Sequence, residues 1–204
     1  MAELPGPPAG PAGAAPDGAP AASPPGRRVL VAVVTGAARE RVGDWRRRND
    51  PEQARRLPPH ATLCSQAPRL PPQAYPLLAA QVRHAFDAPV TVRLGAIGEF
   101  GNTEHTFYVR VEETAALDRA RGRLYDGTHL ALPRREAGGD AWWTWHVTCV
   151  RDVRGRDLAA LRREAAAQRL DLPWRVERVA YLELRGDRYV PLEEWSVGAR
   201  DDHR

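Results

Sequence analysis

The sequence predicts an α+β fold with antiparallel sheet, and two observations support this class. First, short runs of β-branched and apolar residues are interspersed with amphipathic helical segments, and two pairs of strands are joined by turn-rich segments typical of hairpins. Second, a strand that opens with His-x-Thr occurs twice, at His60 and at His146, and each time a helix and a hairpin follow. We therefore expect a bilobal domain in which two antiparallel sheets with flanking helices face each other across a central groove.

The two ends of the chain are expected to lie outside this domain. Pro, Ala and Gly make up 21 of the first 26 positions, a composition that cannot build a core. We predict a disordered extension over 1–26, a domain over 27–199 and a flexible tail over 200–204. Because the chain shows no secretory signal pattern and no run of about 18 apolar residues, we expect a cytoplasmic protein without membrane contact.

The first half is predicted to contain two strands and two helical segments. Residues 29–35 are β-branched and apolar, as expected of a buried strand. The charged stretch 37–56 is expected to form a helix followed by a loop. Leu57-Pro58-Pro59 then forces an extended chain into a strand that begins at His60, because a residue before Pro is kept out of the helical region. A helix over 72–86 follows, with apolar residues at helical spacing and Pro near its start.

The second half begins with a hairpin and contains the second His-x-Thr strand. Strands over 90–97 and 106–111 are separated by a segment rich in Gly and Asn, and a helix over 115–124 comes next. The remaining predicted elements are a loop at 127–140, a strand at 142–150, a helix at 157–170 and a final hairpin with strands at 176–184 and 189–195.

The spacing within each motif places a proton carrier and a hydrogen-bond donor on one face. Side chains two apart on a strand point to the same side, so His60 shares a face with Thr62, and His146 shares a face with Thr148. By chance, two such motifs at the start of predicted strands are expected in only roughly a few per cent of sequences of this composition. We therefore interpret the pair as functional.

This constellation suits cleavage of a phosphodiester. The reaction needs a base that deprotonates the attacking oxygen and an acid that protonates the leaving oxygen, and two imidazoles can supply both. The two Thr hydroxyls would donate to the nonbridging phosphate oxygens, and Arg151, three residues after Thr148, could stabilise the developing negative charge. No metal or other cofactor is expected. The formal net charge of +4 agrees with an anionic partner such as RNA or a nucleotide.

The motif residues resemble the two-histidine (2H) phosphoesterases, which include bacterial 2′-5′ RNA ligases and RNA 2′,3′-cyclic phosphodiesterases. The resemblance rests on Pro-His-Ala-Thr-Leu at 59–63, on His-Val-Thr-Cys-Val-Arg at 146–151, on the separation of 86 positions from the first His to the second, and on a closing strand at 189–197. It implies a bilobal fold and metal-independent hydrolysis of 2′,3′-cyclic phosphate ends or related nucleotide phosphodiesters. It also implies that His60 and His146 are catalytic, that Thr62 and Thr148 bind phosphate, and that Arg151 matches a basic residue after the second motif.

A zinc site is the first alternative interpretation of these residues. Cys64 and Cys149 lie at short spacing from the two His and could complete a Cys2His2 set. However, His146 and Cys149 would face opposite sides of a strand, so they could not bind one ion. The two cysteines are too few for a disulfide framework, although one bridge between them remains an open alternative.

Three further hypotheses concern substrate contacts. Trp142 shares the predicted face of His146 and could stack on a nucleobase, although aromatic residues in a strand are usually core. Arg134 and Arg135 could follow phosphates from a mobile loop, or could be a solvated charged loop. The whole groove could also serve a nonhydrolytic RNA- or nucleotide-binding module. We expect a monomer that acts as a cyclic phosphodiesterase.

Overall fold

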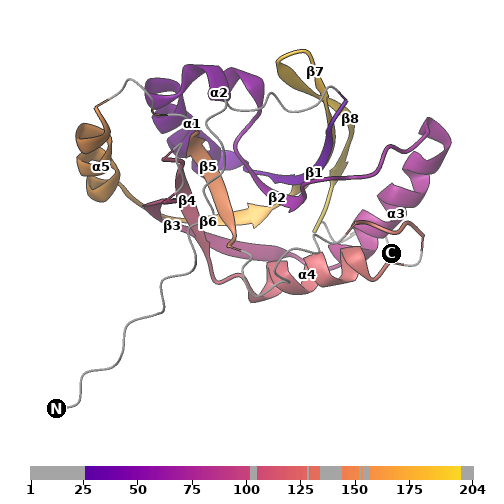
Figure 1. The fold of residues 1–204 in the computed structure, drawn as a ribbon. Coiled ribbons are helices and arrows are strands. Elements are labelled where there is room, and N and C mark those ends of the chain that lie inside the picture. The colour runs from indigo at the N-terminus through magenta and orange to yellow at the C-terminus, as the bar shows by residue number, and fades with distance from the viewer. Residues whose placement is uncertain are drawn as a thin grey trace, which may run out of the picture.

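Eight strands form one antiparallel sheet in the computed structural model, in the order β6-β3-β4-β5-β2-β1-β7-β8 (Figure 1). The structure describes residues 26–101, 105–127, 129–133, 144–151, 153 and 157–198. The strands are β1 (Arg28–Val33), β2 (His60–Cys64), β3 (Val90–Glu99), β4 (Phe107–Glu112), β5 (His146–Val150), β6 (Arg169–Val176), β7 (Arg178–Arg185) and β8 (Arg188–Ser196). The helices are α1 (Gly36–Asn49), α2 (Pro51–Arg56), the short 3-10 helix η1 (Pro72–Ala74), α3 (Tyr75–Ala85), α4 (Ala115–Tyr125) and α5 (Leu158–Ala167). The α+β class with antiparallel pairing is confirmed.

The predicted two separate sheets are instead two halves of one sheet. One half consists of β2, β1, β7 and β8, and the other consists of β5, β4, β3 and β6. They join where β2 pairs with β5, so the two His-x-Thr strands are direct neighbours. The hairpin that follows each motif in the chain lies in the half that contains the other motif. The hairpin after β2 pairs through β4 with β5, and the hairpin after β5 pairs through β7 with β1. The predicted duplication is therefore present, but its two units are interleaved.

The strand β6 corrects the predicted helix at 157–170. The helix ends at Ala167, and the chain turns at Gln168 into an edge strand that pairs with β3. Along this strand Leu170, Trp174 and Val176 are buried while the residues at odd positions between them are exposed, which is the period of two expected of a strand. Its Pro173 is tolerated because an edge strand has an unpaired side.

A second correction concerns the charged stretch after β1. The sequence predicts a helix followed by a loop, but the structure forms two helices, α1 and α2, separated at Asp50. The carboxylate of Asp50 accepts a hydrogen bond from the backbone N–H of Gln53 at 3.0 Å, and Pro51 occupies the first turn, where its missing N–H costs nothing. These two features start the short second helix.

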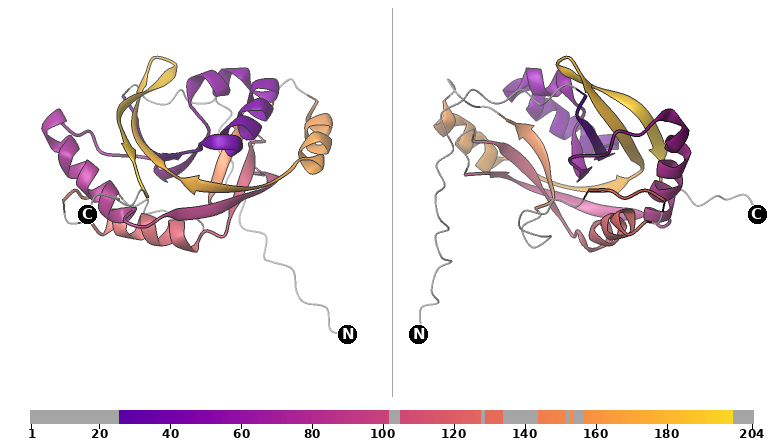
Figure 2. Two further views of the ribbon diagram at one scale, coloured as in Figure 1. Left: turned by 180° about the vertical axis from the view of Figure 1, so that it is seen from behind. Right: turned by 45° about the vertical axis from the view of Figure 1, so that its right-hand side comes forward.

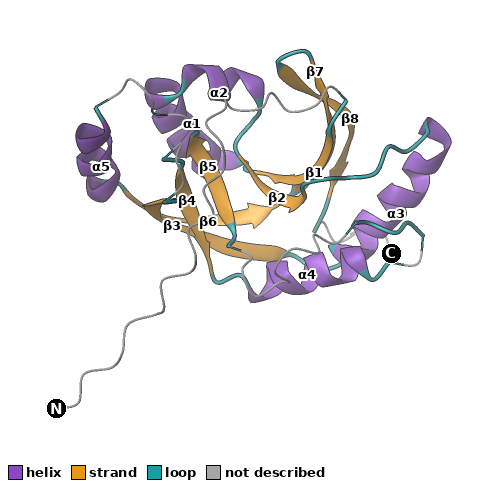
Figure 3. Cartoon of the chain, viewed as in Figure 1, coloured by secondary structure: helices purple, strands orange, loops and turns teal. Residues whose placement is uncertain are grey.

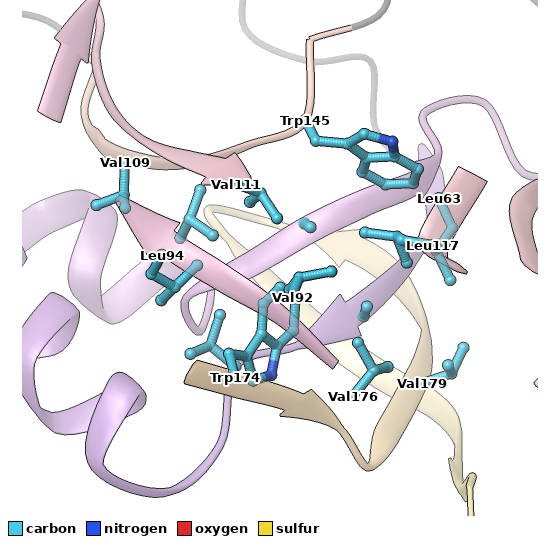
Figure 4. Packing of buried hydrophobic residues seen from close by; sticks show 14 of the residues in the cluster. Leu63, Val92, Leu94, Val109, Val111, Leu117, Trp145, Trp174, Val176 and Val179 are labelled. Carbon is cyan, nitrogen blue, oxygen red and sulfur yellow. The ribbon is translucent and has the colours of Figure 1, made fainter. Parts of the chain in front are cut away.

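The main hydrophobic core lies on the sheet face that the helices cover (Figure 2). It contains apolar residues of α1, α3, α4 and α5 together with alternate residues of the strands. Figure 4 shows part of this packing, with Leu117 of α4 among strand residues such as Val92 and Val111. Examples are Trp45, Leu63, Leu117, Val147 and Trp174. A smaller cluster covers part of the opposite face beside β2. Its members are Val29, Val31, Val33, Leu57, Ala180 and Leu182.

The helices of the structure are short, as Figure 3 shows, and in the described part of the chain none is long and apolar enough to cross a membrane. The predicted extension over residues 1–26 lies outside the described residues except for its last position, and the predicted tail at 200–204 lies wholly outside them. The proposed domain limits and the cytoplasmic location therefore stay predictions.

Candidate active site

The two His-x-Thr motifs meet at the middle of the sheet. Ala61 of β2 pairs with Val147 of β5, and both side chains are fully buried in the core on the helix-covered face. The flanking motif residues are partly exposed and point to the other face, with the same burial pattern in both strands. Because the strands run in opposite directions, this register sets His60 beside Thr148 and Thr62 beside His146. Each imidazole thus lies next to the hydroxyl of the other motif.

Both imidazoles are held by the same backbone contact. Nδ1 of His60 lies 2.8 Å from the carbonyl oxygen of Pro58, and Nδ1 of His146 lies 2.7 Å from the carbonyl oxygen of Thr144. A carbonyl oxygen can only accept, so Nδ1 of each ring carries the proton and Nε2 of the neutral ring is left as an acceptor. In each motif the carbonyl comes from the residue two positions upstream, which fixes the ring and presents Nε2 for proton transfer.

The environment disfavours the charged form of both imidazoles. The pKa of His60 is lowered to about 4, mainly by burial and in part by the positive charges of Arg46 and of protonated His146, against the hydrogen bond to Pro58. The pKa of His146 is also lowered, by burial, against its hydrogen bond to Thr144. The effect of His146 on His60 agrees with the position of the two rings on adjacent strands. A neutral Nε2 is the form that accepts a proton, so His60 is the better candidate for the base.

An aromatic cluster packs around His146. The ring of Phe100 lies edge-on to the imidazole at 5.1 Å between centroids, and the ring of Tyr108 does so at 5.6 Å. Phe100 and Tyr108 stack on each other at 4.1 Å. Gly98 permits this arrangement, since a Cβ at that position would lie 2.8 Å from Cζ of Tyr108. The cluster restricts the ring of His146 on one side and excludes water there.

Arg110 is the cation that the sheet register brings to the motifs. It lies on β4 directly across from His146, and its side chain is exposed. Arg110 forms no ion pair with any residue in the described part of the chain. Arg151, predicted from sequence, comes just after the end of β5, and its backbone N–H donates to Oδ2 of Asp50 at 3.0 Å. This contact involves only the backbone of Arg151, so the predicted role of Arg151 in phosphate binding stays a prediction.

Several predicted site residues lie outside the described residues: Trp142, Arg134 and Arg135. Cys64 and Cys149 are both buried and free. Burial raises the pKa of the Cys149 thiol to about 12, so it is a neutral thiol. No group of three or more His, Cys, Asp or Glu side chains that could hold a metal ion occurs in the ranges that the structure describes.

Sequence reasoning missed Arg110, Tyr108 and Phe100. The alternation in Phe107–Glu112 shows that Tyr108 and Arg110 share one strand face, but not which strand lies beside it. Their relation to His146 depends on the register between β4 and β5, which joins residues about 40 positions apart. Only the structure supplies that pairing.

Comparison with known proteins agrees with this architecture. Among solved structures, the chain is similar to E. coli LigT complexed with 3′-AMP, with 16% identity, a TM-score of 0.54, and coverage of 86% of this chain and 99% of that one. The LigT structure complexed with ATP gives 16% identity, a TM-score of 0.52 and the same coverage. TT0787 of Thermus thermophilus gives 21% identity, a TM-score of 0.54, and coverage of 84% and 98%. At these identities the likeness concerns the fold.

Sequence comparison identifies the family. No curated protein matches the chain. A family model described as the 2′-5′ RNA ligase superfamily matches residues 34–188, which include both His-x-Thr motifs. The match covers most of the chain and agrees with the neighbouring folds, and the chain therefore belongs to the 2′-5′ RNA ligase superfamily of two-histidine phosphoesterases.

Proposed function

We propose that this protein hydrolyses 2′,3′-cyclic phosphate ends of RNA, or related cyclic nucleotide phosphodiesters, without a metal. The observation that carries the proposal is the symmetric pair of imidazoles, each held through Nδ1 by a carbonyl and each next to a Thr hydroxyl. Membership of the superfamily supports phosphodiester chemistry, and the LigT complexes with 3′-AMP and ATP support a nucleotide ligand. The choice of a 2′,3′-cyclic phosphate as the substrate is the most specific part of the proposal.

The proposed reaction uses both Nε2 atoms. Neutral His60 takes a proton from water, and the water oxygen forms a bond to phosphorus. The bond from phosphorus to one ribose oxygen breaks, and protonated His146 gives its proton to that oxygen. The products are a phosphomonoester and a free hydroxyl, with one water consumed. His60 then holds a proton and His146 lacks one, and exchange with solvent restores the starting forms. The same sequence with a hydroxyl of a second RNA end in place of water would be a ligation.

Three further groups are proposed to hold the phosphate. Thr62 and Thr148 are partly exposed on the motif face, where their hydroxyls could donate to nonbridging oxygens. Arg110 lies across from His146 and could neutralise the charge that develops on these oxygens. We retain Arg151 as a sequence-based candidate, but its position after β5 supports it less than Arg110.

The test is hydrolysis of a 2′,3′-cyclic nucleotide and of a short RNA that ends in one, with chelator present. We expect turnover by the wild type and a loss of at least about 100-fold in His60→Ala and in His146→Ala, because each general acid or base contributes roughly that much or more. His84→Ala, an exposed helix position outside the motifs, is the matched control. A wild type that binds RNA but cleaves no phosphodiester would favour the nonhydrolytic binding module instead.

A further inference from the structure

A basic pocket lies between α1 and α2, away from the motif face. It has a volume of about 590 Å³, and the described residues of its lining include four arginines, Arg39, Arg46, Arg47 and Arg55, and no acidic residue. Arg47 forms an ion pair with Asp44, so three of the four arginines have no ion-pair partner among the described residues. The helix α1 packs through its apolar residues on the sheet face opposite to the two imidazoles. This size is within the range of small-ligand pockets, and the lining is strongly cationic.

The buried arginine of this pocket is only half satisfied. Arg46 is 2% exposed, and its Nη2 donates to the carbonyl oxygens of Gln53 at 2.8 Å and Leu57 at 2.7 Å. Its Nε and Nη1 have no hydrogen-bond partner among the residues that the structure describes. A guanidinium stays protonated even when it is buried, so the three N–H groups on these two nitrogens are unsatisfied donors on a buried cation.

No carboxylate forms an ion pair or a hydrogen bond with this guanidinium in the described part of the chain. Burial lowers the pKa of Arg46 by more than the negative charge of Asp50 raises it, and both carboxylate oxygens of Asp50 accept from the backbone N–H groups of Gln53 and Arg151. Arg39 and Arg55 are exposed and form no ion pair with any described residue. An anion in the pocket would add a counter-charge to this desolvated cation.

Gly43 keeps the pocket open. It is a buried residue in the interior of α1, where glycine is unfavourable for a helix, and it lines the cavity. A Cβ at this position would lie 3.1 Å from Nη1 of Arg47. The absent side chain therefore leaves space next to the guanidinium groups, which gives a second observation independent of their charge.

We propose that the α1–α2 pocket binds a phosphate-bearing anion at a site separate from the two-histidine motifs, with Arg39, Arg46 and Arg55 as its ligands. The segment Leu57–Pro59 separates the two sites: Leu57 accepts from Arg46, and Pro58 both lines the pocket and holds the ring of His60 through its carbonyl. The phosphate could belong to a free anion or to the backbone of an RNA whose end reaches the motifs.

Titration of the protein with inorganic pyrophosphate, at ionic strength held constant with sodium chloride, tests the site. Binding is followed by NMR of the arginine Nε–H groups and by calorimetry. We expect Arg39→Ala/Arg55→Ala to raise the dissociation constant at least tenfold. The matched control is Arg41→Ala/Arg163→Ala, which removes two exposed arginines that do not line the pocket. Equal dissociation constants in the wild type and both double variants would overturn the proposal.

A second variant tests the pocket without changing its charge. Gly43→Leu places a side chain in the cavity and replaces an unfavourable helix residue by a favourable one, so the fold should be retained. We expect it to weaken pyrophosphate binding as the double arginine variant does. Unchanged binding in a folded Gly43→Leu protein would contradict a ligand in this cavity.

Two arms distinguish the sources of the phosphate. For an RNA without a cyclic end, a backbone contact predicts that Arg39→Ala/Arg55→Ala reduces the salt dependence of binding, while the control pair does not. A site for a free anion predicts that Arg39→Ala/Arg55→Ala raises the dissociation constant for pyrophosphate but leaves the salt dependence of RNA binding unchanged. Turnover of a cyclic mononucleotide should stay unchanged in all these variants, so a failure of this pocket is distinct from a failure of the two-histidine chemistry. If the double arginine variant binds both pyrophosphate and RNA as the wild type does, the proposed second site does not exist.

Discussion

At the scale of single residues, the two imidazoles differ in how strongly the protein disfavours their charged form. His60 must be neutral to act as the base, and its pKa of about 4 keeps it so above that pH. His146 must be protonated to act as the acid, and its pKa lies below the ordinary value of about 6.5.

These pKa directions predict the pH dependence of activity. We expect kcat/KM to rise above about pH 4 as His60 loses its proton, and to fall again, with a midpoint below about pH 6.5, as His146 loses its own. The negative substrate stabilises imidazolium, so the alkaline limb of kcat should lie at higher pH than that of kcat/KM. Initial rates from about pH 3.5 to about pH 9 provide the measurement. A plateau that extends to high pH would exclude an imidazolium acid.

Arg110 provides a second prediction at this scale. Replacing Arg110 by Ala should lower kcat/KM about 10- to 100-fold, since a charge-assisted hydrogen bond is worth about 1.5–3 kcal/mol. Arg110→Lys should recover part of this loss because it keeps the charge but not the planar fork. Arg151→Ala serves as the comparison and should cost less than Arg110→Ala. Steady-state kinetics in which Arg151→Ala has the larger effect would reverse the assignment.

The sequence predicted the motif residues but only part of their surroundings. The His and Thr side chains could be placed on one strand face because the period of two is a local property. The neighbours Arg110, Tyr108 and Phe100 could not, because strand pairing over long separations leaves no local signal. The same holds for Arg46, whose burial follows from the packing of α1 against α2.

At the scale of elements, the missed and the correct predictions have physical reasons. The strands β1 and β2 and the helix α3 were predicted closely, since Pro and β-branched residues mark their ends and interiors. The edge strand β6 was not, because Pro173 and three charged residues interrupt its apolar pattern. Its partner β3 supplies the ladder that overrides this local composition.

Asp50 links two elements, and its loss should affect both. Asp50→Ala removes the N-cap of α2 and leaves the backbone N–H of Arg151 without its acceptor. We expect a loss of about 2–4 kcal/mol in the free energy of unfolding. Asp157→Ala, which removes only the exposed N-cap contact of α5 to Ala160, is the control and should cost about 1 kcal/mol. Urea denaturation that gives equal losses would rule out the second role of Asp50.

At the scale of the whole molecule, helices supplement the short ladder between the two halves. The helix α1, next to β1 in the chain, packs against β5 and β6 of the other half. In the opposite direction, α4 reaches β2: the hydroxyl of Tyr125 donates to the carbonyl oxygen of Leu63 at 3.0 Å, and Nε of Arg121 does so at 3.3 Å. Each half is therefore held by a helix of the other.

Removing one of these contacts should weaken the association of the halves. Tyr125→Phe deletes the hydroxyl and is expected to cost about 1 kcal/mol of unfolding free energy, together with faster hydrogen exchange of the β2 amides. Tyr189→Phe changes a tyrosine within the first half and should leave that exchange as it is. If the β2 amides are equally protected in both variants, the contact does not hold the halves together.

The interleaved topology has a consequence for the order of folding during synthesis. The strands of the second half, β3 to β6, are contiguous in the chain, so their ladder can close as soon as Val176 has left the ribosome. The first half must wait for β7 and β8, whose partner β1 was made about 150 residues earlier, and such long-range pairing is slow. Pulsed hydrogen exchange should accordingly protect β3 and β4 before β1. His60 would then reach its place beside His146 only after the last hairpin has been made, so a nascent chain has no assembled pair of imidazoles until β8 has left the ribosome.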